Sequence, residues 1–446
     1  MRLDPPPFRF SQITADPDLL RRGVAAAGST LVAELDADYR PWRKVRAIAR
    51  DRSENAEEVW LGLKVRRLGR RARIDVEAMD GEAFSLSITP KMQESLHRID
   101  QALGGGAAAF DHAEGVLADA GARRRFAIRS LMDEAIESSM LEGAATTRQD
   151  AMDLLRSGRS PRSTHELMVV NNYVAMQRIK GWLERELTPG LLCELQALLT
   201  DGTLEDPNQS GRFRRADEPV RVVDARTNQI IYEPPPAGEI ERRVATVCRF
   251  ANATHTGSAF LHPILKACVL HFLIGYEHPF ADGNGRTARA VFFWYALRHG
   301  YRVFEFLVVS DLIRQGYAKY PQAYVDTETD DADLTYFVHY KLGIIERAID
   351  QLRDHIAREE TRITSSLRLV AEHPSLNLRQ RLLLEHALRH PMQVYTVRSH
   401  SVSNGVSLNT ARSDLEGLRE QGVLGTHLEG REVRYMLLPS ALEELS

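Results

Sequence analysis

Apolar side chains recur every three or four positions through most of the stretch between residues 110 and 350. That spacing places them on one face of a helix, so it predicts a mostly helical region. The segment from Phe126 to Gly143 shows the repeat clearly, and its glycine supplies a helix stop. We expect helices at 126–142, 146–157, 164–186, 190–200, 238–254, 261–276, 284–299, 311–327 and 333–360.

The helix expected at 261–276 is apolar around most of its circumference, which predicts that it is buried. His271 is therefore expected to pack in the core or to support other residues rather than to bind a metal. The helix delivers the chain to a short loop at His278, and the next helix is expected to begin at about Asn284. A helix on each side holds such a loop rigidly. Phe280 within the loop is expected to be a packing anchor.

Residues 1–105 combine short strand-like runs with polar turns. Arg73–Val76 and Ala83–Thr89 flank a turn at Met79–Gly81, a pattern typical of a β-hairpin. We therefore expect a small α+β domain here. The Gly/Ala run at Gly104–Ala109 marks a candidate domain boundary.

Basic side chains are frequent between residues 64 and 73 of this predicted domain. We expect a solvated charged face there, with contact to an acidic partner as the alternative. The residues are Lys64, Arg66, Arg67, Arg70, Arg71 and Arg73.

A second hairpin is expected at 219–235, where two β-prone runs flank a turn-prone segment. Three prolines at 234–236 end the second run. The candidate functional residues of this hairpin are Val220, Val222, Ile231 and Tyr232.

Residues 375–446 form a further unit, in which the pattern predicts a helix, a strand, a helix and a hairpin in that order. Ser407 is expected to cap the second helix, and Gly422 to stop it. The expected elements are a helix at Leu376–His390, a strand at Val394–Val397, a helix from Ser407 to Gln421, and paired strands at Val423–Thr426 and Val433–Leu437.

This order resembles a winged helix-turn-helix. The resemblance implies a recognition helix in the major groove of DNA, with further contacts to phosphates. However, the unit's eight arginines are matched by eight acidic residues, whereas a DNA-binding domain usually has a basic excess. DNA contact and a protein-interaction or dimerising role are therefore equal alternatives. The residues for DNA contact are Asn409, Thr410 and Arg412 in the groove, with Arg431 and Arg434 on phosphates.

Composition limits the class of protein. A chain of 446 residues is long enough for two or three domains, and 27% charged with 43% hydrophobic residues is typical of a soluble globular protein. Cys193, Cys248 and Cys268 show no paired spacing, which argues against a disulfide framework or a structural zinc site. The chain has no run of about eighteen apolar residues and no signal-peptide core, so we expect a cytoplasmic protein without membrane contact. The formal charge of −3 gives no general argument for nucleic-acid binding.

The run at 278–289 begins with a loop suited to binding an anion. Gly283 and Gly285 can adopt positive φ angles, which allow successive backbone N–H groups to point inward as a nest. If a helix begins at about Asn284, its positive N-terminal end faces the same place.

The charged and titratable residues of this run fit the same chemistry. Arg286 and Arg289 are three apart and lie on one helical face, where guanidinium groups can grip phosphate oxygens. Asp282 is a hard oxygen ligand suited to Mg²⁺. His278 can accept a proton near neutral pH. Together these groups predict a phosphate-transfer site.

The run resembles the signature of the Fic family, His-x-Phe-x-(Asp/Glu)-Gly-Asn-Gly-Arg-x-x-Arg, at every fixed position. Members typically transfer AMP from ATP to a protein hydroxyl. Relatives that transfer a phosphate have lysine where this chain has Gly285, so the resemblance favours nucleotidyl transfer. It implies His278 as general base, Asp282 as the Mg²⁺ ligand, and Gly283, Asn284, Gly285, Arg286 and Arg289 around the phosphates of ATP.

The resemblance covers about residues 110–350. It implies that the hairpin at 219–235 is the family's flap, whose edge holds the target segment by main-chain pairing and presents its hydroxyl to the histidine.

The stretch Ser138–Gly143 fits the family's inhibitory pattern, (Ser/Thr)-x-x-x-Glu-(Gly/Asn). Ser138 and Glu142 are four apart and so share a face of the helix at 126–142. In relatives, this glutamate pairs with the second arginine of the signature, here Arg289, which then cannot hold the γ-phosphate. The resemblance therefore implies an autoinhibited enzyme. In some relatives the same glutamate positions a water that removes AMP, and the sequence leaves that activity open.

The sequence thus predicts a mainly α protein. It has an all-helical Fic core over 110–350 with a β-hairpin flap, a small α+β N-terminal domain over 1–105, and a C-terminal winged helix-turn-helix over 375–446. The predicted activity is transfer of AMP from ATP, with Mg²⁺, to a Ser, Thr or Tyr hydroxyl of a target protein. Self-modification and a homodimer are consistent with it. Two alternatives stay open: a DNA-binding regulator whose Fic domain senses nucleotide, and a Fic enzyme that uses another nucleotide or removes AMP.

Overall fold

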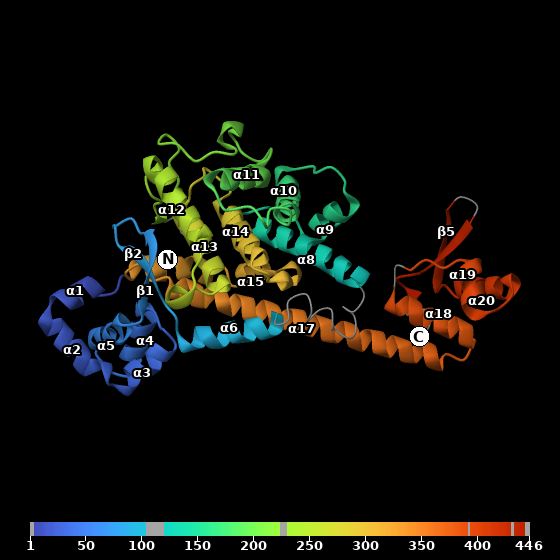
Figure 1. Cartoon of the computed structure of the whole chain (residues 1–446), viewed down its shortest axis with the longest axis horizontal. Helices are drawn as coiled ribbons and strands as arrows, with labels where there is room; N and C mark the ends of the chain where they lie inside the picture. The colour runs from blue at the N-terminus through green and yellow to red at the C-terminus, as the bar shows by residue number, and fades with distance from the viewer. Residues whose placement is uncertain (1–3, 104–119, 224–229, 391–392, 430–431, 442–446) are drawn as a thin grey trace. The chain divides into compact units, whose positions relative to one another are not determined.

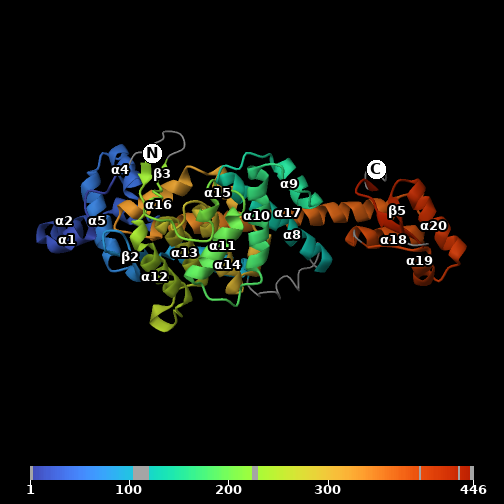
Figure 2. The same cartoon turned by 90° about the horizontal axis from the view of Figure 1, so that it is seen from above.

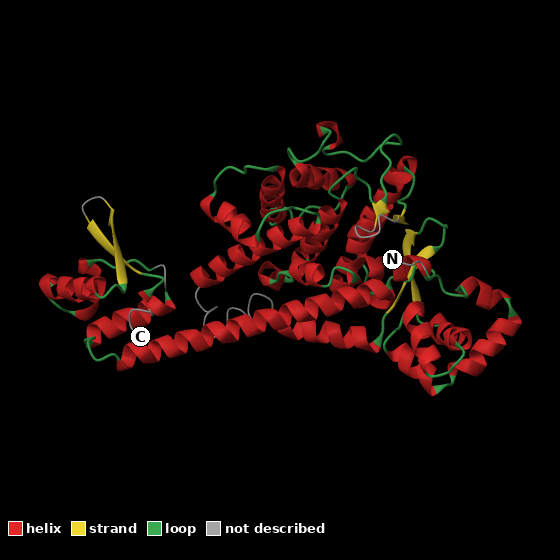
Figure 3. Ribbon diagram, turned by 180° about the vertical axis from the view of Figure 1, so that it is seen from behind, coloured by secondary structure: helices red, strands yellow, loops and turns green. Residues whose placement is uncertain are grey.

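The computed structural model describes residues 4–103, 120–223, 230–390, 393–429 and 432–441. Helices account for 65% of the residues and strands for 7%, which confirms the mainly α prediction (Figure 1, Figure 3). Internal contacts group residues 1–106 with 128–349, and residues 107–127 with 350–446. The domain limits expected from the sequence stay predictions.

The N-terminal part contains more helix than its strand-like runs indicated. The side chain of Asp16 accepts hydrogen bonds from the first backbone N–H groups of α2, and Asn55 does the same for α5. Val32, Val45 and Trp60 are fully buried where α3, α4 and α5 meet. The elements are α1 (Phe10–Ala15), α2 (Pro17–Ala27), α3 (Thr30–Ala37), α4 (Trp42–Asp51), α5 (Ala56–Leu68), β1 (Arg71–Glu77), β2 (Ala83–Ser87) and α6 (Pro90–Leu103).

The expected N-terminal hairpin is confirmed. Strands β1 and β2 pair antiparallel, with Ala72 opposite Leu86. Strand β2 also bonds to a distant segment: the N–H of Ser85 donates to the carbonyl of Ala332 at 3.1 Å, and the carbonyl of Ser85 accepts from the N–H of Leu334 at 2.9 Å. The hairpin is therefore joined to the loop that follows α16 (Lys319–Thr329).

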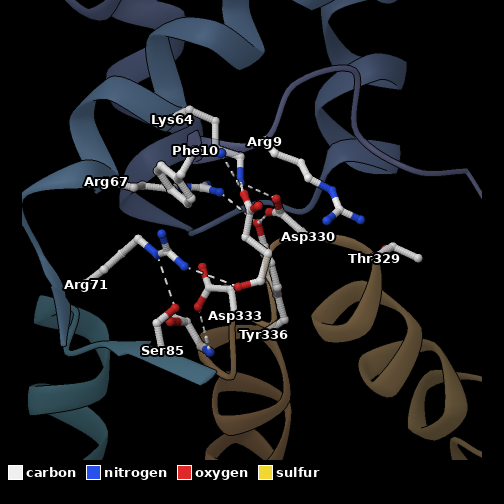
Figure 4. A network of polar contacts seen from close by, with 12 residues as sticks. Arg9, Phe10, Lys64, Arg67, Arg71, Ser85, Thr329, Asp330, Asp333 and Tyr336 are labelled. Carbon is white, nitrogen blue, oxygen red and sulfur yellow. Dashed lines mark hydrogen bonds and ion pairs between the residues drawn. The ribbon is translucent and has the colours of Figure 1, made fainter. Parts of the chain in front are cut away.

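The prediction of a solvated basic face at 64–73 is wrong for two of its members. The side chains of Lys64 and Arg67 are each only 1% exposed. The ammonium group of Lys64 is paired with the carboxylate of Asp330 (Figure 4). It is also paired with the carboxylate of Asp331. The acidic partner is thus a loop of the same chain, some 260 positions further on, and no local pattern could reveal it.

A hydrogen-bond network surrounds the ion pairs of Lys64 with Asp330 and Asp331. Arg67 donates to the hydroxyl of Tyr336 at 2.8 Å, and that hydroxyl donates to Asp330 at 2.6 Å (Figure 4). The hydroxyl of Tyr39 donates to Asp333 at 2.6 Å. Each of these buried charged side chains has a partner. The N-terminal part is therefore held against the 330–336 segment without an unpaired buried charge in this network.

The mostly helical character predicted between 110 and 350 is confirmed for its described residues, with three corrections. The helix expected at 333–360 continues to Glu372. The helix expected at 164–186 ends at Ile179, where turns closing at Gly181 and Trp182 replace helical hydrogen bonds. The helix expected at 311–327 is two helices, because the chain turns at Gly316. The helices are α8 (Ala120–Leu141), α9 (Arg148–Ser157), α10 (Thr164–Ile179), α11 (Pro189–Thr200), α12 (Ile240–Asn252), α13 (Pro263–Glu277), α14 (Asn284–Arg298), α15 (Val309–Gln315), α16 and α17 (Thr335–Glu372).

Helices α13 and α14 lie side by side at the centre of this region (Figure 1, Figure 2). Every residue of α13 from Ile264 to Ile274 is buried, as its apolar sequence predicted, and His271 is among them. The loop between the two helices is the expected anion-binding run.

The hairpin expected at 219–235 is also present. Strands β3 (Val222–Val223) and β4 (Ile230–Tyr232) pair antiparallel, with Val222 opposite Tyr232. Residues 224–229 of its turn lie outside the described residues.

The C-terminal unit has its own core, to which Leu384, Leu415 and Val423 contribute fully buried side chains. The cap at Ser407 is confirmed, since its hydroxyl accepts from the N–H of Thr410 at 3.1 Å. The elements are α18 (Leu378–Arg389), α19 (Val397–Asn404), α20 (Leu408–Glu420), and the antiparallel pair β5 (Leu424–Glu429) and β6 (Glu432–Leu437).

The strand expected at 394–397 is largely wrong. Only Tyr395 makes a bridge, to Tyr435, and α19 then begins at Val397. Thr396 and Ser399 form a capping box, which starts a helix where the β-branched residues indicated a strand.

The winged-helix DNA contacts stay predictions. Asn409 and Arg412 are exposed on α20 and Thr410 is half-buried, whereas Arg431 lies outside the described residues. None of the helices in the described part of the chain has the length and apolar character needed to span a bilayer.

Lys64→Met should lower the free energy of unfolding by about 3–5 kcal/mol, because it leaves the carboxylates of Asp330 and Asp331 without their cation. Urea unfolding followed by tryptophan fluorescence measures the change. Arg21→Met is the control, since it removes an ion pair whose side chains are 79% and 59% exposed. Equal urea midpoints for the Lys64→Met and Arg21→Met variants would contradict a stabilising role of the Lys64 ion pairs.

Candidate active site

The loop between α13 and α14 turns the chain at two left-handed positions. His278 has φ +46° and its N–H still donates to the carbonyl of Ile274 at 3.1 Å, so it closes α13. Gly283 has φ +85° and precedes α14, where a Cβ would lie 2.8 Å from the methyl group of Thr200. Gly283, the residue before α14, has no side chain that could cap the first N–H groups of the helix. The positive end of this helix is therefore open to an anion.

Asn284 holds the loop together from inside. Its side-chain oxygen accepts from the N–H of Phe280 at 2.9 Å, and its amide donates to the carbonyl of Phe280 at 2.8 Å. Phe280 is completely buried and packs against Phe213, with ring centroids 5.5 Å apart, so the expected anchor is confirmed. Both polar groups of the Asn284 side chain are bonded to Phe280. The expected contact of Asn284 with the phosphates therefore stays a prediction, and it would be made by the backbone.

Two side chains that the sequence reasoning did not select hold the loop from outside. Arg214 donates to the carbonyl of His278 at 2.9 Å and also to that of Pro235, just after the hairpin. Gln196 donates to the carbonyl of Asp282 at 3.2 Å and accepts from the N–H of Gly211 at 2.7 Å. Arg214 is only 7% exposed and Gln196 is fully buried.

The imidazole of His278 has a fixed tautomer. Its Nδ1 lies 3.0 Å from the carbonyl of Gly275, and a carbonyl only accepts, so Nδ1 carries the proton. Nε2 is then a free acceptor, to which no described residue donates. Burial lowers the pKa of His278 below its ordinary value of 6.5, although the Gly275 carbonyl and the Glu142 carboxylate oppose this shift. The ring is thus a neutral base near pH 7.

Asp282 and Arg286 form an ion pair where the loop meets α14. The carboxylate of Asp282 accepts from Arg286 at 2.9 Å and is 55% exposed, whereas Arg286 is 1% exposed. Arg286 also donates to the carbonyl of Leu199 at 2.9 Å, and its buried Nε has no partner among the described residues.

The donor set at Asp282 fits Mg²⁺. The described residues contain no group of three or more metal-binding side chains, so a metal here would need further ligands. Mg²⁺ is commonly held by one or two carboxylates together with substrate phosphates and water. An exposed carboxylate beside an open helix N-terminus meets that requirement.

The segment around Ser138 meets Arg289, far along the chain. Arg289 donates to the hydroxyl of Ser138 at 2.8 Å, to its carbonyl at 2.9 Å, and to the carboxylate of Glu142 at 2.9 Å. Burial alone would lower the pKa of Arg289, but the nearby Glu142 carboxylate raises it above its usual value. The expected contact between Glu142 and Arg289 is therefore present.

Gly285 lies directly beneath this contact. A Cβ built there would be 2.3 Å from Glu142 Oε1 and 3.2 Å from the Nη1 of Arg289, which is buried without a partner among the described residues. Any side chain at 285 would therefore displace the carboxylate. The sequence motif indicated only the backbone freedom of this glycine, not the close approach of Glu142.

The hairpin is connected to the same region through tyrosines. The hydroxyl of Tyr232 donates to the carbonyl of Tyr276 at 2.9 Å, and Tyr276 is two residues before His278. Ile230 is 45% exposed at the start of β4. Val222 is a strand residue, Val220 precedes the strand, and for Ile231 only the backbone is described. Docking of a target by these residues stays a prediction.

Comparison with known proteins covers the centre of the chain. Residues 186–296 match the Fic/DOC family. Protein adenylyltransferase Fic of Drosophila melanogaster is 33% identical over 99 residues, which are 22% of this chain and 17% of that protein. The Culex quinquefasciatus protein of the same name is 28% identical over 145 residues, 32% of this chain and 25% of that protein. The chain thus matches a quarter or less of these relatives' length.

Solved structures share the fold over a longer stretch. A Fic family protein from Desulfovibrio desulfuricans G20 aligns with a TM-score of 0.52 and 20% identity, covering 79% of this chain and 97% of that one. Fic-1 (residues 134–508) from C. elegans aligns with a TM-score of 0.51 and 20% identity, covering 73% of this chain and 84% of that one. At this identity the likeness concerns the fold alone.

The matched segment contains the whole 278–289 run, and this part of the chain therefore belongs to the Fic/DOC family and is distantly related to protein adenylyltransferase Fic.

Proposed function

We propose that this protein is an adenylyltransferase that moves AMP from ATP to a hydroxyl group of a protein and is restrained by Glu142. One observation carries the proposal: a neutral imidazole with a free Nε2 stands beside an open helix N-terminus. The names of the relatives, protein adenylyltransferase Fic, support the same chemistry.

The triphosphate of ATP would lie against the N-terminal turn of α14. Backbone N–H groups there have no side-chain cap. Two buried guanidinium nitrogens, Nε of Arg286 and Nη1 of Arg289, also lack partners among the described residues. An anion would satisfy such groups, since buried donors without acceptors are costly. Mg²⁺ would be held by Asp282 and would supply positive charge to the phosphates.

The reaction follows from the position of the base. His278 Nε2 takes the proton of a target Ser, Thr or Tyr hydroxyl, and the oxygen attacks the α-phosphorus of ATP. The new bond joins that oxygen to phosphorus, and the bond to the bridging oxygen breaks, so pyrophosphate leaves. The positive end of α14 and the two arginines stabilise the charge on the phosphates.

The hairpin of β3 and β4 would present the target. An extended target segment would add to an edge of this short sheet by main-chain hydrogen bonds. The Tyr232 to Tyr276 hydrogen bond would keep the hairpin beside His278. A second copy of this chain is one such target.

Gly285 favours nucleotidyl transfer over phosphate transfer. The space above it is occupied by Glu142 Oε1, and a lysine there would collide with that carboxylate. The same contact supplies the restraint, because Arg289 is engaged by Glu142 and is not free for the outer phosphate of ATP.

Glu142→Gly should increase labelling of protein by ATP carrying the label on its α-phosphate. Loss of one charged hydrogen bond corresponds to about 1.5–3 kcal/mol, or roughly ten- to a hundredfold. Autoradiography of the full-length protein with cell lysate measures it. Label on the γ-phosphate should not transfer. Transfer of γ-label would instead indicate phosphorylation, and loss of label from modified protein would indicate AMP removal.

His278→Ala in the Glu142→Gly background should reduce that labelling by roughly 10²–10⁴-fold, since the base is removed. Binding of ATP, measured by calorimetry, should be retained because the imidazole is not expected to hold the phosphates. Full labelling in this double variant would refute the assignment of the base.

The rate of labelling should vary with pH as the fraction of His278 in its neutral form does. Because burial lowers the pKa of His278 below 6.5, the active neutral form persists through neutral pH and is lost only as the pH falls further. Labelling by Glu142→Gly protein should thus be flat between about pH 7 and 8, and the acid limb should lie below the ordinary histidine pKa. A steep fall between pH 8 and 7 would be inconsistent with this base.

A further inference from the structure

The inhibitory helix α8 turns three carboxylates toward the protein interior. Asp133 and Glu134 are each 7% exposed and Glu137 is completely buried. Acidic side chains are almost never fully buried unless they are paired. Their partners therefore show what α8 is docked against.

Glu134 binds the beginning of α15. One of its oxygens accepts from the N–H of Ser310 at 2.9 Å, and the other from the Ser310 hydroxyl. Val308, the residue before α15, offers no side-chain cap, so Glu134 satisfies that helix end from another element. Negative charge at a helix N-terminus is stabilising.

Glu137 binds the other end of α15. It accepts from Nε of Arg314 in the last turn of that helix, and Arg148 approaches it to 3.8 Å. The Glu137 side chain is 0% exposed, whereas that of Arg314 is 41% exposed. The pair is thus a buried anion covered by a cation that reaches solvent.

These two contacts fix the position of the inhibitory residues along α8. Glu134 and Ser138 are four apart and share a face of α8, and Glu142 follows in the turn just after the helix ends at Leu141. Glu134 meets α15 at one end of this stretch, while Ser138 and Glu142 meet Arg289 at the other. A shift or rotation of α8 relative to α15 would move Glu142 off Arg289.

We propose that Glu134 and Glu137 are positioning residues, which dock α8 on α15 and thereby hold Glu142 against Arg289. The α15 surface then sets the strength of the restraint. This inference rests on the proposed function, since it concerns the same inhibited state.

Glu137→Gln in the full chain tests the proposal. The substitution keeps the volume, removes the charge, and leaves Arg314 able to reach water and Asp311, 3.4 Å away. Labelling with α-labelled ATP should rise about two- to thirtyfold over wild type, the range of such coupling effects. Glu134→Gln should act in the same direction. The matched control is Glu166→Gln, which breaks an Arg159 ion pair that does not involve α8 and should leave labelling unchanged.

The double variant Glu137→Gln/Glu142→Gly distinguishes a positioning role of Glu137 from an effect on labelling that does not depend on Glu142. If Glu137 acts only through Glu142, the double variant should label no faster than Glu142→Gly alone. A further increase, or a large loss, would overturn the proposal. Where Glu137→Gln fails to fold, judged by circular dichroism and thermal melting, Arg314→Gln breaks the same pair from the exposed side and should release the restraint equally.

The two hypotheses fail differently. If Glu142→Gly is active while the Glu137 and Arg314 variants stay at the wild-type level, the positioning role is wrong and the proposed function stands. If Glu142→Gly is itself no more active than wild type, the proposed restraint is wrong, and the inference falls with it.

Discussion

Two buried helices can face each other across a six-residue loop only if the chain reverses sharply at both of the loop's ends. His278 and Gly283 provide the reversals, at φ +46° and +85°. The turn at His278 leaves its imidazole bonded to the carbonyl of Gly275 with Nε2 free. The turn at Gly283 leaves the start of α14 uncapped. One backbone constraint therefore produces both the proposed base and the proposed phosphate site, and Asn284 locks the loop between them.

This arrangement concentrates positive charge in a buried place. The start of α14, Arg286 and Arg289 all require an anion, because buried cations without partners are costly. The chain supplies its own anions: Asp282 pairs with Arg286, and Glu142 pairs with Arg289. ATP would have to replace at least the second of these. The electrostatic demand that would make the site bind a nucleotide is thus the same demand that makes an internal carboxylate an effective inhibitor.

Charged side chains also carry much of the docking between elements. Lys64 with Asp330 and Asp331 fixes the N-terminal part, and Glu137 with Arg314 fixes α8. Such pairs specify orientation as well as stability, since each oxygen must meet a donor in one geometry. Apolar packing tolerates small shifts more readily than a buried ion pair does. A helix docked in this way is suited to hold Glu142 in register.

The sequence by itself determined the helices of the core, both predicted hairpins of the unit that holds the site, and the identity of the 278–289 run. These features depend on periodicity and on residues close together in the chain, which any local pattern records. Tertiary structure alone decided that Lys64 is buried, that Arg214 and Gln196 hold the loop, and that Gly285 makes room for Glu142. Each of these contacts joins positions far apart in sequence, and a single sequence contains no measure of their distance in space.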